Sequence, residues 1–365
     1  MPITKRLFPA AVAAATVVSL FAGTVPADAA STCGSACRLT KAARSFVQAT
    51  GGPPAIVITV RHGGSSKTIT GGVADLQAQE PPSADDEMRV ASVAKAYSGA
   101  VALSLVSDGQ LSLDDTVGEL LPTLPRRWAH VTLRQLLDHT SRIPDFSQQP
   151  SFRDALIADP QHAPTPATLL DYARDVPLQP RRANNYHYSN SDNVIVALMA
   201  AAVTHNSYED DLESQVLRPL GLGRTSLPTG SSLTPPFLHG YALSADDPPE
   251  DVTSLFTPGW AWASGGVVST PTELARFVRA YVSGKLFNKT TRHAQFQFVA
   301  GSSEPPGPGT NAAGLALFRY SMACGTVYGH TGNTAGYTQF AAASANGADS
   351  VTVSVTAQIT PSSDP

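Results

Sequence analysis

The chain has 365 residues, of which 42% are hydrophobic and 15% are charged, and this is enough apolar material for one large domain or two ordinary ones. Its net charge is −4, and acidic and basic residues are interspersed, which argues against a nucleic-acid partner and a polybasic membrane patch. The sequence has no His-Glu-x-x-His motif and no metal-type spacing of cysteine and histidine, so we expect no metal and no other cofactor.

The first 30 residues have the pattern of a secretory signal peptide. Lys5 and Arg6 precede an apolar run over residues 7–22, and the small-residue segment Ala27-Asp28-Ala29 follows. No later run approaches the roughly 18 apolar residues of a membrane span. We therefore expect a secreted, extracellular protein with residues 1–30 removed and with no transmembrane segment.

Three cysteines, Cys33, Cys37 and Cys324, follow the predicted signal peptide. An odd number leaves one thiol free or paired outside the chain. Cys324 is expected on a strand, and its pairing with Cys33 or Cys37 would tie the N-terminal helix to the sheet. Pairing of Cys33 with Cys37 would close only a short local loop, and the sequence does not choose between these pairings.

The N-terminal part of the mature chain predicts a helix, a hairpin and a buried helix in that order. Apolar residues recur on one face over residues 39–49, and a glycine-bearing turn joins the strand patterns at 55–61 and 67–73. Residues 93–106 are apolar almost all the way round, which predicts a helix buried on every side. Further helices are predicted at 132–139, 166–174, 191–203 and 208–217.

The C-terminal part returns to strands. A short buried strand is predicted at residues 262–268, and a capping box with proline starts a helix at Pro271 that ends before Gly284. The glycine- and proline-rich segment 301–311 is expected to be only a connector. Further strands are predicted at 313–320, 326–330, 337–343 and 351–355, the last two joined by an Asn346-Gly347 turn.

Strand patterns at both chain ends flank a mostly helical middle, which predicts an α/β (α+β) fold. One antiparallel sheet would be built from the two ends, with helices packed on it and a mostly helical domain inserted. We assign residues 31–90 and 266–365 to the sheet domain and residues 91–265 to the helical domain. Ser92 would then lie where the two meet.

Ser92 and Lys95 stand three residues apart at the start of the buried helix, so their side chains share one face. A desolvated lysine can lose several pKa units and take the proton of a serine hydroxyl near neutral pH. A Ser-x-x-Lys tetrad also arises by chance in a chain of this length, so the tetrad alone is a weak signal.

Two further clusters carry polar side chains, Tyr188-x-Asn190 before a predicted helix and His330-Thr331-Gly332-Asn333 at the end of a predicted strand. Taken alone, the first is as often a turn with a stacked aromatic residue, and the second more often holds a structural histidine. In this order they resemble the motifs of the penicillin-recognising serine hydrolases. That family includes class C β-lactamases, D-alanyl-D-alanine carboxypeptidases and related esterases, and the likeness extends over residues 55–355.

The resemblance implies a β-lactamase/transpeptidase-like fold and a role for each motif residue. Ser92 is the nucleophile, Lys95 lowers its proton affinity, and Tyr188 relays the proton to the leaving nitrogen. Which of Lys95 and Tyr188 is the base is left open. Asn190 would hold Lys95 and the substrate amide, and the backbone N–H groups of Ser92 and Asn333 would form the oxyanion hole.

The resemblance also implies a substrate-binding strand. His330 and Thr331 would face a substrate carboxylate, with a charge on His330 that depends on pH, and Gly332 would let the strand backbone approach the substrate. Arg319 could add a second positive charge there, although a solvated strand arginine is the simpler interpretation.

Three features depart from the family pattern. Arg142 stands where relatives usually have glycine, which predicts a different loop conformation, and Tyr186 and His187 are expected only to pack beside Tyr188. The chain also ends at Pro365, without the terminal helix that covers the sheet in relatives. A truncated member would expose an apolar sheet face, unless another chain or the N-terminal helix covers it.

These features predict a secreted serine hydrolase that forms an acyl-enzyme through Ser92. Its expected substrates are D-alanyl-D-alanine peptides, as for a carboxypeptidase, or β-lactams, as for a β-lactamase, so its partner is a small molecule or a peptidoglycan peptide. Two alternatives stay open, an esterase acting on small esters and a penicillin-binding receptor or scaffold without turnover. The sequence carries no signal for the oligomeric state.

Overall fold

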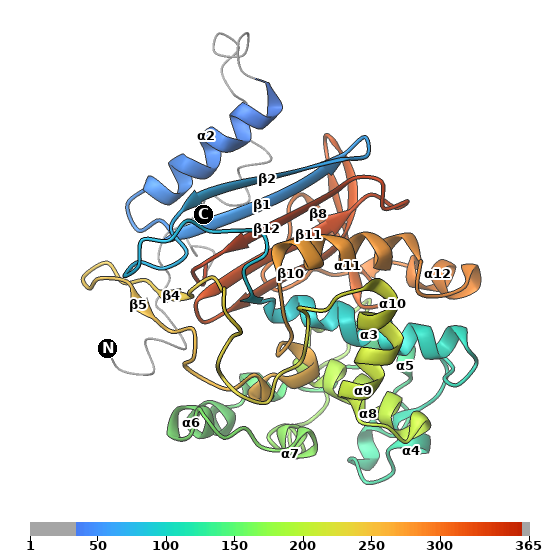
Figure 1. Ribbon diagram of the computed structural model, residues 1–365. Helices are drawn as coiled ribbons and strands as arrows, with labels where there is room; N and C mark the ends of the chain where they lie inside the picture. The colour runs from blue at the N-terminus through green and yellow to red at the C-terminus, as the bar shows by residue number, and fades with distance from the viewer. Residues whose placement is uncertain (1–33, 360–365) are drawn as a thin grey trace.

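The computed structural model describes residues 34–359, and an eight-stranded antiparallel sheet runs through its centre (Figure 1). The strand order is β2-β1-β12-β11-β10-β9-β8-β7. The N-terminal hairpin joins the C-terminal strands because β1 pairs with β12, with Ile56 opposite Val355. The sheet is therefore built from both chain ends, as the sequence predicted. The strands are β1 Ala55–His62, β2 Ser65–Gly72, β7 Val299–Ala300, β8 Thr310–Gly314, β9 Leu317–Met322, β10 Gly325–Thr334, β11 Tyr337–Ala343 and β12 Ser350–Val355.

Helices cover both faces of the sheet, as alternating side chains on β1 require. Ile56 and Ile58 pack with Phe46 of α2 (Ser35–Gln48), while Val57 belongs to the main core that contains Phe277 of α11 (Pro271–Ser283). The apolar face over β1, β2 and β12 is thus covered by the N-terminal helix, one of the two possibilities that the sequence left open (Figure 1). Residues 360–365, at the end of the chain, lie outside the described residues.

The segments between β3 and β6 are mostly helical and lie together below the sheet in Figure 1. They share one hydrophobic core with the sheet, so the proposed boundaries at residues 91 and 265 stay a prediction.

The α-helices are α3 Ala94–Ser107, α4 Val117–Leu120, α5 Leu133–Leu137, α6 Pro150–Ala158, α7 Pro166–Asp171, α8 Asn190–Thr204, α9 Tyr208–Leu212 and α10 Arg218–Leu220, and α12 Lys289–Gln295 follows α11. Short 3₁₀ segments are η2 Ala91–Val93, η3 Arg126–Trp128, η4 Phe146–Gln148, η6 Pro258–Trp260 and η7 Trp262–Ser264, and η5 Glu213–Leu217 is a π-helical turn. Two small strand pairs join β3 Met88–Arg89 with β6 Val268–Ser269 and β4 Tyr241–Ala242 with β5 Glu250–Asp251.

Helix α3 lies at the centre of the molecule. Every residue from Ala94 to Leu105 is buried, which confirms the prediction from its apolar sequence. Its N-terminus faces β10, and Asn193 of α8 donates a hydrogen bond to Ser98 Oγ at 2.9 Å. The first turn of α3 is therefore held between the sheet and α8.

Two strand predictions were wrong because a buried turn has the same apolar composition as a buried strand. Residues 262–268 form η7 and only the start of β6, and Gly266 N donates to Trp262 O at 2.7 Å to close the turn. Residues 313–320 form two strands, β8 and β9, with a tight turn at Leu315 and Ala316. Both turn residues are buried in the core, so no polar residue marked the break.

Cys324 is free and exposed in the turn between β9 and β10, whereas Cys37 is disulfide-bonded. The two pairings that involve Cys324 are therefore not formed, and Cys324 does not lie on a strand. Cys33 and the predicted signal peptide at 1–30 lie outside the described residues.

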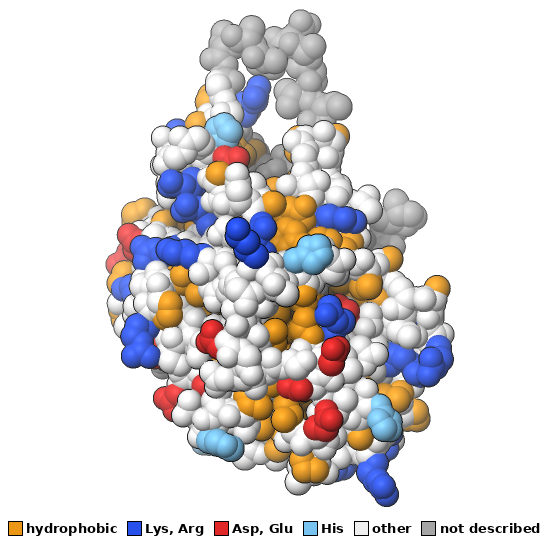
Figure 2. All heavy atoms as spheres, turned by 90° about the vertical axis from the view of Figure 1, so that its right-hand side faces the viewer, with side chains coloured by type: hydrophobic (Ala, Val, Ile, Leu, Met, Phe, Trp, Pro, Cys, Tyr) orange, Lys and Arg blue, Asp and Glu red, His pale blue; other side chains and the backbone are white. Residues whose placement is uncertain are grey.

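Within residues 34–359, no helix is long and apolar enough to cross a membrane. On the face shown in Figure 2, basic side chains predominate in the upper part and acidic side chains in the lower part, with apolar side chains between them.

Candidate active site

Ser92 lies in η2, immediately before α3, and its side chain is partly accessible. The preceding residue, Ala91, has a φ of 50°, in the left-handed region that non-glycine residues rarely adopt. The Val93 N–H donates to Val90 O at 3.2 Å, which closes a tight turn around the serine. The turn and α3 together fix the serine one helical turn from Lys95.

Lys95 is fully buried, and three acceptors surround its ammonium group. Its Nζ donates to Ser92 Oγ at 3.1 Å, to Asn190 Oδ1 at 2.6 Å and to the Ser264 carbonyl at 2.8 Å. An ammonium group has three N–H donors, so each is satisfied. The amine is therefore held against the serine oxygen.

Asn190 is the first residue of α8, and two hydrogen bonds fix the orientation of its amide. Its Nδ2 donates to Asp145 Oδ2 and to Ser147 Oγ, both at 2.9 Å. The amide oxygen must then face Lys95. The structure thus brings Ser92, Lys95 and Asn190 together, as the motif set predicted.

Burial lowers the pKa of Lys95 to about 7, although the carboxylates of Asp145, Glu304 and Asp192 oppose this shift. Near neutral pH a large fraction of Lys95 is therefore the free amine, which can accept the Ser92 proton. At lower pH the amine is protonated and cannot do so.

We expect kcat/KM for a neutral ester such as p-nitrophenyl acetate to rise with pH through an apparent pKa near 7. Below that value the rate should fall about tenfold per pH unit, because only the unprotonated fraction of Lys95 acts as a base. The measurement is a pH–rate profile between about pH 5 and about pH 9, which brackets the expected pKa and the range in which most folded proteins are stable. A rate that falls as pH rises through 7 would instead assign the active form to the protonated lysine.

Tyr188 precedes Ser189, the N-cap residue of α8, and its ring covers the Lys95 amine. Lys95 Nζ is 5.0 Å from the ring centroid, and the ring of His139 packs against Tyr188 at 4.6 Å. The phenol oxygen is buried and makes no hydrogen bond to any described residue. Burial raises the pKa of Tyr188 well above its usual value, and the nearby Ser92 hydroxyl opposes this shift only in part. The phenol therefore keeps its proton near neutral pH.

A buried network beneath Tyr188 was not predicted as part of the site. His139 Nδ1 lies 2.8 Å from Asp192 Oδ2, and Ser141 Oγ donates to Asp192 Oδ1 at 2.6 Å. Burial lowers the pKa of His139 to about 3 and raises the pKa of Asp192 well above its usual value, so burial favours the uncharged form of each group. This network fixes the surface on which the Tyr188 ring rests.

His330 lies on β10, and its ring contacts Phe318 at 5.0 Å and Tyr188 at 6.4 Å between centroids. It is 1% exposed, and its Nδ1 donates to the Thr331 carbonyl. Burial lowers the pKa of His330 to about 3, and the charge of Lys95 adds to this effect. The predicted pH-dependent charge near neutrality is therefore wrong, because the histidine is buried beside a lysine.

The next residues of β10 hold the strand against the nucleophile. The Thr331 hydroxyl donates to the Pro305 carbonyl at 2.6 Å, so Thr331 anchors a loop. A Cβ on Gly332 would lie 2.4 Å from Val90 O and 3.1 Å from Ser92 N. Glycine is thus required here by the approach of β10 to η2, whereas the sequence suggested an approach to the substrate.

Asn333 lines a pocket together with Ser92, and its side chain is held in place. Its Nδ2 donates to Ile359 O at 2.8 Å, and its Oδ1 accepts from Thr338 Oγ1 at 2.7 Å. Beyond Gly329, β10 pairs with β11 but not with β9. The assignment of the Ser92 and Asn333 N–H groups as an oxyanion hole stays a prediction.

The structure places two arginines that the sequence singled out. The Arg319 guanidinium lies over the Phe298 ring at 4.9 Å and lines neither pocket described below, so it is not placed to bind a substrate at Ser92. Arg142 has a φ of 65°, which is the left-handed conformation that glycine favours. Its Nε donates to Gln179 O at 2.7 Å, which helps to hold this conformation, and a loop conformation different from that of relatives stays a prediction.

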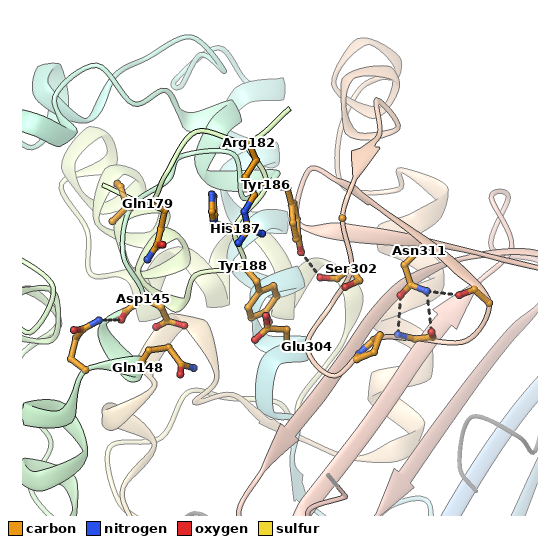
Figure 3. Close-up of a pocket in the computed structure, with 16 residues that line it drawn as sticks. Asp145, Gln148, Gln179, Arg182, Tyr186, His187, Tyr188, Ser302, Glu304 and Asn311 are labelled. Atoms are coloured by element: carbon orange, nitrogen blue, oxygen red, sulfur yellow. Dashed lines mark hydrogen bonds between the residues drawn. The ribbon is translucent and has the colours of Figure 1, made fainter. Parts of the chain in front are cut away.

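Two adjoining pockets lie in this region, and one of them is lined by the serine. The first, here called the aromatic pocket, has a volume of about 330 Å³ and contains Ser92 and Asn190. The second, the polar pocket, has a volume of about 880 Å³ and contains Tyr188 (Figure 3). Gln148 lines both, so they adjoin at this residue. Apolar side chains of the aromatic pocket are Phe146, Phe152, Leu156, Phe256 and Trp260, and charged side chains of the polar pocket include Asp145, Arg182 and Glu304.

The segment 301–311, which was predicted to be only a connector, does lead from β7 into β8, and it also forms a wall of the polar pocket. Tyr186 holds it in place, because its hydroxyl donates to Ser302 O and its ring fills the space beside Gly301. His187 also lines the pocket, and its Nε2 lies 2.9 Å from Pro180 O. Packing is thus part of the role of both residues, as predicted, but both also face the pocket.

Several residues of the site gave no usable signal in the sequence. Ser264 contributes its backbone carbonyl, which any residue type could supply. Asp145 and Glu304 stand alone in loops and Gln148 ends the short segment η4, and a polar residue is ordinary at such positions. Among residues 34–359, no group of three or more His, Cys, Asp or Glu residues is placed to hold a metal ion.

A family model described as Beta-lactamase matches residues 39–364. The chain belongs to the Beta-lactamase family. Among solved structures, the D-stereospecific amidohydrolase from a Streptomyces species is 28% identical, with a TM-score of 0.79 over 89% of this chain and 95% of that chain. The D-amino acid amidase from Ochrobactrum anthropi SV3 in complex with L-phenylalanine, at 23% identity and a TM-score of 0.72 over 84% of this chain and 88% of that chain, shares the fold.

Curated relatives of this Beta-lactamase family member match over part of their length. Penicillin-binding protein 4 of Amycolatopsis lactamdurans is 26% identical over 246 residues, which are 66% of this chain and 62% of that protein. Protein flp of Staphylococcus aureus strain MRSA252 is 25% identical over 201 residues, which are 54% of this chain and 39% of that protein. The chain thus spans less than two thirds of these relatives. Family and fold identify it as a serine hydrolase of the β-lactamase and penicillin-binding protein superfamily, with the predicted β-lactamase/transpeptidase-like fold.

Proposed function

We propose that this protein is a serine amidohydrolase that cleaves amides of D-amino acids through an acyl-enzyme on Ser92. The observation that carries this proposal is the buried Lys95 amine, 3.1 Å from Ser92 Oγ, beside pockets that can receive a substrate. The D-stereospecific amidohydrolase, which is 28% identical over nearly its whole length, supports an amide with a D-configured acyl group.

The two shifted pKa values suggest a route for the proton. Lys95, with a pKa near 7, would take the proton of Ser92 as its oxygen attacks the amide carbonyl carbon. Tyr188, which stays protonated, would pass a proton to the leaving nitrogen, and Lys95 would restore the phenol. The amide C–N bond then breaks to leave an ester on Ser92. Water completes the cycle by hydrolysing this ester.

The charges around the site favour a leaving group without a carboxylate. A carboxypeptidase must bind the terminal carboxylate of its substrate, but His330 is buried and uncharged and Arg319 lies elsewhere. Of the described residues lining the two pockets, Arg182 is the one arginine or lysine, and it lies near Tyr186 and His187 (Figure 3). A simple amide needs no cation next to Ser92, so it suits this site better.

The carboxypeptidase and β-lactamase assignments form the second candidate. The match to penicillin-binding protein 4 favours them, as do the three motifs that the sequence retains. Secretion, inferred from residues 1–30, is likewise a proposal.

The experiment is a substrate panel measured on wild type and Ser92→Ala. We expect wild type to release ammonia from D-phenylalaninamide faster than from L-phenylalaninamide, and Ser92→Ala to release none above background. The aromatic pocket should receive the phenyl ring, so D-phenylalaninamide should be a better substrate than D-alaninamide.

Incubation with benzylpenicillin, followed by mass spectrometry, separates the candidates. A folded wild type that cleaves no D-amide but gains the mass of penicillin would support the second candidate. A folded wild type with neither property would exclude the acyl-enzyme proposal.

A further inference from the structure

We infer that the Glu304 carboxylate binds the α-ammonium group of the substrate, so that the enzyme selects amides with a free α-amino group over their N-acylated counterparts. This inference rests on the proposed function and names a specificity residue for it. It is carried by the position of Glu304, by its lack of a partner and by the chemistry of the substrate.

The loop that carries Glu304 is fixed on both sides of this residue. Ser303 Oγ lies 3.0 Å from the Tyr320 hydroxyl, and Pro305 O accepts the Thr331 hydroxyl at 2.6 Å. Thr331 belongs to the motif of β10 that packs against the nucleophile. The carboxylate is thereby held in the polar pocket, next to the Tyr188 ring (Figure 3).

Glu304 is the carboxylate of this pocket that has no partner among the described residues. Asp145 also lines the pocket, but its Oδ1 accepts from Ser147 N at 2.8 Å and its Oδ2 from Asn190 Nδ2 at 2.9 Å. No hydrogen bond or ion pair engages the Glu304 side chain, which is exposed to the pocket. Loss of water around the carboxylate raises the pKa of Glu304, Asp145 raises it further, and Lys95 opposes the shift. A cation bound beside Glu304 would offset the repulsion from Asp145.

The substrate places a cation in this region. In an amino acid amide, the ammonium nitrogen is two bonds from the scissile carbonyl carbon, about 2.5 Å away. When Ser92 attacks that carbon, the ammonium group must lie close to the serine and to Tyr188. Glu304 and Asp145 are near enough to both Lys95 and Tyr188 to shift their pKa values. N-acetylation would remove the charge and leave the carboxylate unpaired.

The test measures binding in the Ser92→Ala background, so that turnover does not contribute. Calorimetric titration at pH 6.5, about one unit below the usual pKa of an α-amino group, gives the affinity for D-phenylalaninamide and for N-acetyl-D-phenylalaninamide. We expect D-phenylalaninamide to bind at least about tenfold more weakly to Ser92→Ala/Glu304→Gln than to Ser92→Ala, as for loss of one charge-assisted hydrogen bond. Added salt should weaken binding of the charged ligand more than binding of the acetylated one.

Ser92→Ala/Glu213→Gln is the matched control, because Glu213 is an exposed glutamate that lines neither pocket. It should bind D-phenylalaninamide as Ser92→Ala does. Equal affinity with and without Glu304→Gln, an equal loss with Glu213→Gln, or no detectable binding of D-phenylalaninamide would each overturn the inference. These outcomes are separate from failure of the proposed function, which would appear as wild type that binds D-phenylalaninamide but releases no ammonia.

Discussion

Replacement of Lys95 by methionine is expected to slow acylation of Ser92 by about a thousand-fold, within the usual range for loss of a general base. The Lys95 amine is the basic group in contact with Ser92 Oγ, and Tyr188 cannot replace it, because its raised pKa keeps the phenol protonated. Methionine has a similar length and needs no hydrogen bonds, so it fits a fully buried position. Acylation would be followed as the burst of p-nitrophenol from p-nitrophenyl acetate.

The melting temperature of the Lys95→Met variant must be measured together with its acylation rate. Methionine would leave the Asn190 and Ser264 oxygens without a donor, but it would also remove the cost of a buried amine. We expect a melting temperature within a few degrees of wild type, which corresponds to about 1 kcal/mol for a chain of this size. Lys289→Met, at an exposed position on α12, is the matched control and should acylate at the wild-type rate. A folded Lys95→Met enzyme with a near-normal burst would show that another group takes the serine proton.

Replacement of Tyr188 by phenylalanine is expected to slow cleavage of D-phenylalaninamide by at least about a hundred-fold without unfolding the protein. The Ser92 hydroxyl lies near the phenol oxygen, but Ser92 Oγ also accepts from Lys95 Nζ, so removal of the phenol oxygen leaves Ser92 with a partner. The phenylalanine ring keeps the contacts with His139 and Lys95. The loss should therefore lie in catalysis, and the melting temperature should change little.

The leaving group gives a sharper test of Tyr188. An amide nitrogen must be protonated to leave, whereas p-nitrophenolate leaves without a proton. The Tyr188→Phe variant should therefore lose much less activity toward p-nitrophenyl acetate than toward D-phenylalaninamide. Tyr328→Phe, which changes a tyrosine in the separate cluster around Phe296 and Phe298, is the control. An equal loss with both substrates would show that the phenol acts at the attack of Ser92 and not at departure of the nitrogen.

Much of the fold followed from local patterns in the sequence. The alternating segment 337–343 forms a strand with the predicted bounds, and the Asn346-Gly347 turn joins it to β12, because each signal describes contacts close in the chain. The pairing of Ser92 with Lys95 followed from helix geometry in the same way. Their convergence with Tyr188 depends on packing between distant segments, and it was predicted from the resemblance to a family.

Other properties of the site depend on the folded environment and leave no local pattern. The neutral state of His330 comes from its burial beside Lys95, which a sequence motif does not record. The left-handed conformation of Arg142 is held by Gln179, a residue far along the chain. The segment that carries Glu304 and forms a wall of the polar pocket is held by hydrogen bonds from Tyr186 and Thr331, which come from different parts of the structure.

Helix α3 has no face in contact with solvent over residues 94–105, since it is enclosed by α8 and α9 on one side and by β9 and α12 on the other. Neither group of elements could separate from the rest without exposing this apolar segment to water. Catalytic activity and native structure should consequently disappear together as urea concentration rises, in a single cooperative transition. A proteolytic fragment that keeps only one flank would not preserve the geometry at the serine.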